Sequence, residues 1–126
     1  MHSEVISLNA EGAPIAKLVT LILLQASDKD IAQFSYFEDG LLEPEWCPTP
    51  PAKMAPNILN RLKIIAGLEP LRYQTPISGD FELVVLDARP HAPDAKQTVR
   101  GKVTIHDYLS PRRVDVEMLL EPKYAH

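Results

Sequence analysis

The sequence of 126 residues lacks several features by which a function is often recognised. It has a single cysteine, Cys47, so no disulfide can form within one chain, and a reducing cytoplasm is the compartment that fits best. Basic residues are fewer than acidic ones, 13 against 17, which gives a net charge of −4. Because a nucleic-acid-binding face needs clustered basic side chains, this balance argues against nucleic acid as a partner.

Long apolar runs are also missing. The longest run, 21–24 with its neighbours, is interrupted by polar residues and falls far short of the roughly 20 residues needed to span a bilayer. The N-terminus has no basic segment followed by an apolar one, as a signal peptide would have. We therefore expect a cytoplasmic protein without direct membrane insertion.

Motifs for metal, phosphate or acyl chemistry do not stand out. No pair of histidines has zinc-ligand spacing among His2, His91, His106 and His126. The Gly-x-x-x-x-Gly-Lys-Ser/Thr loop that cradles nucleotide phosphates does not occur. His106, Asp107 and Ser110 are residue types of a hydrolytic triad, but they follow one another along a single strand end, and a polar strand terminus is the simpler interpretation. We expect no enzymatic activity, no cofactor and no metal.

What is present is typical of one globular domain, with 45% hydrophobic and 24% charged residues. We expect an N-terminal arm over residues 1–11, as a short strand or a loose segment, and a single domain over residues 12–126.

Two segments have the apolar spacing of helices. The first runs from Pro14 to about Ala26, since a proline suits the first helical turn. The second covers about residues 52–66, with an apolar stripe and Gly67 placed to end it; the stripe consists of Met54, Ile58, Leu62 and Ile65. This spacing predicts that Arg61 and Lys63 flank the stripe and face solvent.

The remaining segments indicate strands. Residues 31–37 alternate with period two, Asp39-Gly40 suits a tight turn, and residues 41–46 return as an edge strand that contains Pro44. Three further strands are expected within 81–88, 98–109 and 112–121, with 88–96 as a surface loop. The order α-β-β-α-β-β-β predicts an α+β fold in which two helices pack on one face of an antiparallel sheet.

Several segments, spread in order over residues 12–121, carry a resemblance to a known family. They are "GAPIAKLVTLILLQASDKD", "YFEDGLLEPEWCPTPP", "ILNRLKIIAGLEP", "PISGDF" and "VDVEMLL". Together they resemble the N-terminal, N2-type domain of the ATPases of type II secretion and type IV pili. The resemblance implies a PAS-like fold that, in the family, precedes a RecA-like motor domain, and no P-loop of such a motor is found here.

The departures from the family concern charge. Where active members have arginines that reach the nucleotide, this sequence has Tyr73, Gln74, Asp80 and, in the last strand, Glu117. Arginine pairs bidentately with phosphate oxygens, whereas a carboxylate repels them. The resemblance thus implies a degenerate, non-catalytic interaction or regulatory module. Its expected partner is a protein, either a secretion or pilus ATPase or a second copy of the chain. The candidate partner-binding residues are Arg61, Lys63, Arg72, Tyr73, Gln74 and Asp80.

Alternative interpretations remain open at this point. A PAS-like cavity between sheet and helices would make the protein a small-ligand sensor, although the apolar strands look well filled. Trp46 is either a recognition residue or, more commonly, a residue that packs against the adjacent helix. The acidic hairpin around Glu38 and Asp39 is either a solvated edge or a docking surface for a basic partner.

Overall fold

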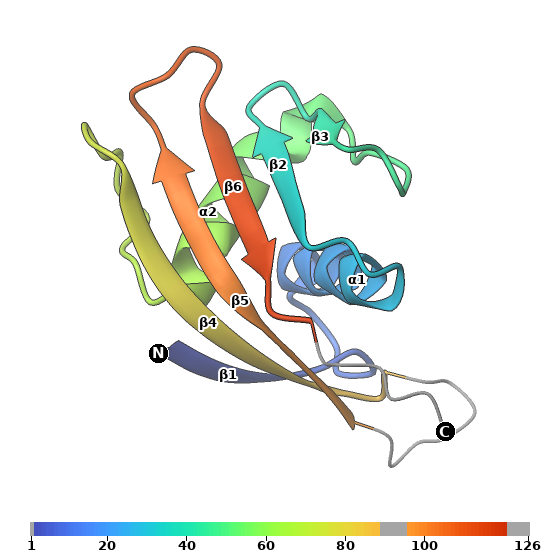
Figure 1. Ribbon diagram of the computed structural model, residues 1–126. Coiled ribbons are helices and arrows are strands. Elements are labelled where there is room, and N and C mark those ends of the chain that lie inside the picture. The colour runs from blue at the N-terminus through green and yellow to red at the C-terminus, as the bar shows by residue number, and fades with distance from the viewer. Residues whose placement is uncertain (1, 89–95, 121–126) are drawn as a thin grey trace.

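Six strands and two α-helices make up residues 2–88 and 96–120, the part of the chain that this computed structural model describes (Figure 1). In chain order they are β1 (His2–Ser7), α1 (Pro14–Asp28), β2 (Gln33–Phe37), β3 (Leu42–Glu43), α2 (Ala55–Ile65), β4 (Ile77–Leu86), β5 (Lys96–His106) and β6 (Arg113–Met118). A short 3-10 turn, η1 (Ala52–Met54), leads into α2. The two predicted helices and the α+β class are confirmed. Most of the expected surface loop at 88–96 lies outside the described residues.

The sheet is mixed, so the prediction of an antiparallel sheet is wrong in one respect. Its strand order is β1-β4-β5-β6-β2-β3, and β1 runs parallel to β4 while the other neighbours are antiparallel. The predicted element order omitted β1, which we had expected only as a short strand or a loose arm. The reason is that β1 pairs His2 with Phe81 and Ser7 with Leu86, a partner far along the chain that local alternation cannot reveal.

Both helices lie against the same face of the sheet, and the other face is open (Figure 1). Alternation along the strands directs Phe81, Leu83 and Val85 of β4 toward the helices, where all three are buried. Leu62 and Ile65 of α2 are buried in the same cluster, as the helical stripe predicted. The open face carries the alternate residues of the strands, and these are mostly polar.

The end of α2 is fixed by a turn that needs glycine. Gly67 has a φ of +74°, the Gly67 N–H donates to the Ile64 carbonyl, and the Leu68 N–H donates to the Lys63 carbonyl. This pair of bonds is a Schellman motif, which confirms Gly67 as the predicted stop. Strand β4 passes so close that a Cβ on Gly79 would lie 2.3 Å from the Ala66 carbonyl oxygen.

The predicted hairpin is confirmed between β2 and β3. Gly40 has a φ of +89°, and the Phe37 N–H donates to the Leu41 carbonyl at 2.9 Å. Strand β3 forms one edge of the sheet as expected, but it is only two residues long, shorter than the strand predicted over 41–46. Trp46 stacks edge-on against Phe34 of β2, with 4.7 Å between the ring centroids.

Candidate functional site

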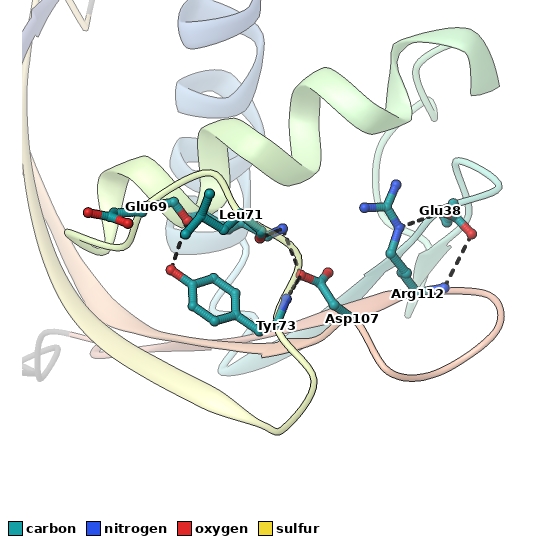
Figure 2. Close-up of polar contacts among 7 residues, drawn as sticks. Glu38, Glu69, Leu71, Tyr73, Asp107 and Arg112 are labelled. Atoms are coloured by element: carbon teal, nitrogen blue, oxygen red, sulfur yellow. Dashed lines mark hydrogen bonds and ion pairs between the residues drawn. The ribbon is translucent and has the colours of Figure 1, made fainter.

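Lys63 is buried, so the prediction that it faces solvent is wrong. Its side chain is 1% exposed, and its ammonium group donates to Asp107 Oδ2 at 2.7 Å and to the Leu71 carbonyl at 2.6 Å (Figure 2). Helical spacing did place Lys63 at the flank of α2. However, the chain that follows α2 folds back over this flank, so the ammonium group lies beneath the loop rather than in water.

Asp107 is the partner that the sequence analysis missed. It is fully buried, and its Oδ2 also accepts the Tyr73 N–H at 2.9 Å, while its Oδ1 lacks a hydrogen-bond partner among the described residues. A signal was available in the sequence. Alternation in β5 buries Val103 and Ile105 and continues to Asp107, and a carboxylate at a buried position requires a cation.

Tyr73 adds to the first connection, the one that Lys63 and Asp107 make between α2, the loop after it and β5. Its hydroxyl donates to the Glu69 carbonyl at 2.9 Å, and the Lys63 ammonium lies 5.6 Å from the centroid of its ring. The loop between α2 and β4 is thereby bound to α2 through Lys63 and to the end of β5 through Asp107, as Figure 2 shows.

A second connection joins the β2–β3 hairpin to the β5–β6 loop. The Arg112 guanidinium pairs with the Glu38 carboxylate (Figure 2). In the reverse direction, the Glu38 N–H donates to the Arg112 carbonyl at 2.9 Å. The hydrogen bond from Arg112 lowers the pKa of Glu38, and the nearby charge of Arg72 adds to this effect. Arg72 therefore lies at the same end of the molecule as the hairpin.

These three segments, 38–41, 69–74 and 107–112, form a surface that we call the loop end. It exposes large side chains, namely Leu41 at 54%, Leu71 at 55% and Tyr108 at 46%, and the Tyr108 ring lies edge-on against His106 of the open face, with its hydroxyl 3.0 Å from His106 Nδ1. Arg72 and Gln74 are exposed beside them. The loop end thus combines exposed large side chains and an arginine with a backbone held by one buried ion pair and one partly exposed ion pair.

The six predicted partner-binding residues do not form one surface. Arg72, Tyr73 and Gln74 lie at the loop end, whereas Arg61 pairs with Glu4 of β1 and Lys63 is buried. Asp80 lies on the open face of the sheet, because alternation in β4 turns it away from its buried neighbour Phe81. The expected surface of Arg61 and Lys63 with the 72–80 turn is therefore not formed, and partner binding by any of these residues stays a prediction.

The open face carries a cross-strand pattern of charges. Asp80 of β4 is level with Lys102 of β5, which is level with Glu117 of β6. Beside them, Arg100 pairs with Glu82 at 2.8 Å. Opposite charges alternate across neighbouring strands, which stabilises a solvated sheet face.

A polar cluster on the same face was also missed by the sequence analysis. Asp115 accepts Ser35 Oγ–H at 2.7 Å, and its other oxygen lies 2.9 Å from His106 Nε2. These residues come from three neighbouring strands, so only their pairing register brings them together. The His106 and Asp107 side chains lie on opposite faces of the sheet, so the sequence-adjacent triad residues do not converge.

In the described part of the structure, the hollows on the open face are larger in volume than the hollow in the core. Two shallow hollows of about 360 and 480 Å³ lie on the open face and share Glu117. The hollow between α1, α2 and β2, lined by Val19, Phe34 and Ile58 among others, has only about 10 Å³. This volume is below the hundreds of Å³ that small-molecule pockets provide.

Comparison with known proteins adds no family assignment. Neither a scan against protein-family models nor a search of the curated proteins finds a match to this chain. Within the described residues, neither helix is long and apolar enough to cross a membrane.

Proposed function

We propose that the protein is a non-catalytic interaction module that docks to a protein partner through the loop end. The observation that carries the proposal is the combination of exposed Leu41, Leu71 and Tyr108 with segments joined by the buried Lys63–Asp107 pair and the partly exposed Arg112–Glu38 pair. Side chains held on an ordered backbone lose less conformational entropy on binding. Aromatic and arginine residues are also the types that dominate binding energy at protein interfaces.

We further propose that the module is a degenerate, PAS-like relative of the N-terminal domain of secretion and pilus ATPases. Two residues that carry the resemblance support this, because both shape the junction between α2 and β4. Gly67 ends α2, and Gly79 allows β4 to pass against Ala66. The partner proposed on this basis is a secretion or pilus ATPase, in the cytoplasm.

The charges of the open face support a function without nucleotide. Lys102 lies between Asp80 and Glu117, so a polyphosphate that approached this lysine would meet two carboxylates. We expect calorimetric titration with Mg-ATP to give no binding heat. A micromolar dissociation constant would contradict the non-catalytic proposal.

The small-ligand sensor is less well supported. A PAS-like sensor needs a cavity between sheet and helices, and the hollow lined by residues of α1, α2 and β2 has about 10 Å³, the size of a single water at most.

The docking proposal is tested by a double change at the loop end, Leu71→Ser with Arg72→Glu. Both side chains are exposed, so we expect the free energy of unfolding to change by less than about 1 kcal/mol. The matched control is Lys96→Glu, a charge reversal at the opposite end of β5, about 30 Å away along the strand.

Tagged parent, double variant and control are used to capture partners from the native cytoplasm, and the eluates are read by mass spectrometry. The parent and Lys96→Glu are expected to enrich a secretion or pilus ATPase, and the double variant to lose it. If the parent enriches no such ATPase, or all three proteins enrich it equally, the docking proposal is wrong.

A further inference from the structure

Strand β1 is the outermost strand at one edge of the sheet (Figure 1). Within residues 2–88 and 96–120 its one sheet partner is β4, against which it runs parallel over residues 2–7. The Leu8 N–H donates to the Leu86 carbonyl at 3.3 Å, which shows that even-numbered residues of this segment direct their amide groups toward β4. Because backbone groups alternate along a strand, Ser3, Val5 and Ser7 direct theirs toward the open edge.

We propose that β1 pairs antiparallel with β1 of a second copy of this chain, about a two-fold axis at Val5. The sheets of both copies then become continuous. Val5 faces Val5 of the other copy, and Ser3 faces Ser7, so every hydrogen-bonded pair joins two residues whose amides already point outward. This register gives about six inter-chain N–H···O bonds, two of them to the Ser7 carbonyls, which also accept the Ala10 N–H of their own chain at 3.3 Å.

The alternative registers are less favourable. Only odd-numbered residues direct their amides outward, so each hydrogen-bonded pair joins two odd-numbered residues. The two-fold axis can then lie at Glu4, Val5 or Ile6. An axis at Glu4 places two carboxylates directly opposite each other, which is destabilising. An axis at Ile6 leaves Ser3 outside the strand pairing. With the axis at Val5, Glu4 faces Ile6 and all three outward residues are paired.

Charge and exposure favour a second copy as the occupant. An inward-pointing charge on an edge strand normally discourages pairing, but Glu4 is compensated by Arg61 of its own helix α2. Val5 is 64% exposed on the open face and would be covered by its symmetry mate. Ile64 of α2 is 38% exposed. It follows Arg61 by three residues, so it lies on the side of the helix that approaches β1. The two-fold axis brings the Ile64 side chains of both copies toward each other.

This inference is independent of the loop end. Strand β1 lies against Phe81–Leu86, whereas the loop end joins β4 at its first residue, Ile77. A dimer of this kind therefore leaves both loop ends uncovered, and either proposal can fail without the other.

The register is tested by cysteine cross-linking in a Cys47→Ala background. In an antiparallel hydrogen-bonded pair the Cα atoms are about 5.5 Å apart, within the range of a disulfide. Val5→Cys is therefore expected to give a disulfide-linked dimer under mild oxidation. In the same dimer the two copies of Ser3 are about 13 Å apart along the strands, so Ser3→Cys is expected to form no disulfide cross-link. Cross-linking of Ser3→Cys as fast as Val5→Cys, or of neither, would overturn the proposal.

The interface itself is tested by sedimentation. An edge-strand interface is small, so we expect the mass of the parent to rise with concentration from the 14.1 kDa chain mass toward twice that value. Val5→Pro removes an N–H that points outward and has no partner in the described part of the chain, so it should abolish the dimer while keeping the melting temperature. Val5→Ala retains this N–H and should retain the dimer. A parent that stays at the monomer mass, or a Val5→Pro variant that dimerises like the parent, would overturn the proposal. If Val5→Pro fails to fold, the cross-linking experiment still tests the register.

Discussion

At the scale of single residues, the buried pair of Lys63 and Asp107 is the strongest constraint on the loop end. Both side chains are removed from water, and the pair is 2.7 Å apart. Taking two charges out of water is costly, and their attraction offsets this cost only while both are present. The pair therefore contributes little net stability, but each member depends strongly on the other, and the arrangement of the 69–74 loop depends on both.

The first prediction concerns this dependence. Lys63→Met leaves the Asp107 carboxylate buried without its cation, so we expect a loss of about 3–5 kcal/mol in the free energy of unfolding. The double variant Lys63→Met with Asp107→Leu removes both charges and should recover most of this loss. Urea unfolding of both single variants and the double variant measures the coupling. Additive losses would show that the two groups do not act as a pair.

The second prediction uses Tyr36, whose buried hydroxyl has no hydrogen-bond partner among the described residues. Burial, with a smaller contribution from Asp39, raises the pKa of Tyr36 from 10.0 to about 12. Between these values the unfolded chain loses the tyrosine proton and the folded chain keeps it, so the unfolded state binds fewer protons and stability falls as pH rises. The contribution is fully present below pH 10 and is lost as pH rises toward 12.

Tyr36→Phe removes this titration and the unpaired hydroxyl. We expect the variant to be as stable as the parent at pH 7 and to gain on it by roughly 2–3 kcal/mol between pH 10 and 12, at about 1.4 kcal/mol per pKa unit. The measurement is the difference in unfolding free energy across this range, in which other titrating groups cancel. A pH-independent difference would mean that Tyr36 ionises normally in the fold.

At the scale of elements, the junction of α2 with β4 sets the geometry from which the loop end is built. The Schellman turn at Gly67 ends α2, and the chain then passes through the loop end and returns as β4, which crosses directly beside Ala66. Gly79 is required there for space and not for a special backbone angle. The connection between α2 and β4 therefore starts at Ala66 and returns to it at Gly79, where the two backbones are too close for an added Cβ.

The third prediction follows from this contact. In Gly79→Ala the added Cβ would lie 2.3 Å from the Ala66 carbonyl oxygen, so backbone must move, and we expect a loss of about 1–3 kcal/mol. Ser78→Ala, the neighbouring position on the open face, is the control and should change stability by less than about 0.5 kcal/mol. Thermal unfolding of the two variants separates the outcomes. Equal melting temperatures would show that α2 and β4 are further apart than described.

At the scale of the whole molecule, sequence patterns predicted what is local and missed what is distant in sequence. The helices at Pro14 and Ala55, the hairpin at Gly40 and the stop at Gly67 follow from spacing and backbone preference over a few residues. The parallel pairing of β1 does not, because its partner lies beyond α1, β2, β3 and α2. Placing Asp80 on the open face likewise required knowing which face of the sheet the helices cover.

The candidate site was predicted in part for the same reason. Arg72, Tyr73 and Gln74 were named because the resemblance to the secretion ATPases singles out this turn, and their contribution to binding remains a prediction. The burial of Lys63 depends on Asp107, which is 44 residues further along the chain, and on a loop that folds back. Helical spacing alone could not distinguish a solvated lysine from one that a later segment covers.

The last prediction concerns how stability is distributed over the whole sheet. Strand β5 has partners on both sides and its inner residues are buried, whereas β1 has a strand partner, β4, on one side alone within the described residues. In dilute, monomeric solution we expect the amide of Val103 to exchange its hydrogen only through global unfolding. The amides of Glu4 and Ile6, which point toward β4, should exchange earlier through local opening of β1, and the outward amide of Val5 earlier still. Residue-resolved hydrogen exchange measures this order directly. If Glu4 and Ile6 exchange as slowly as Val103, then β1 unfolds together with the core, and residues 1–11 are an integral part of the domain and not an arm.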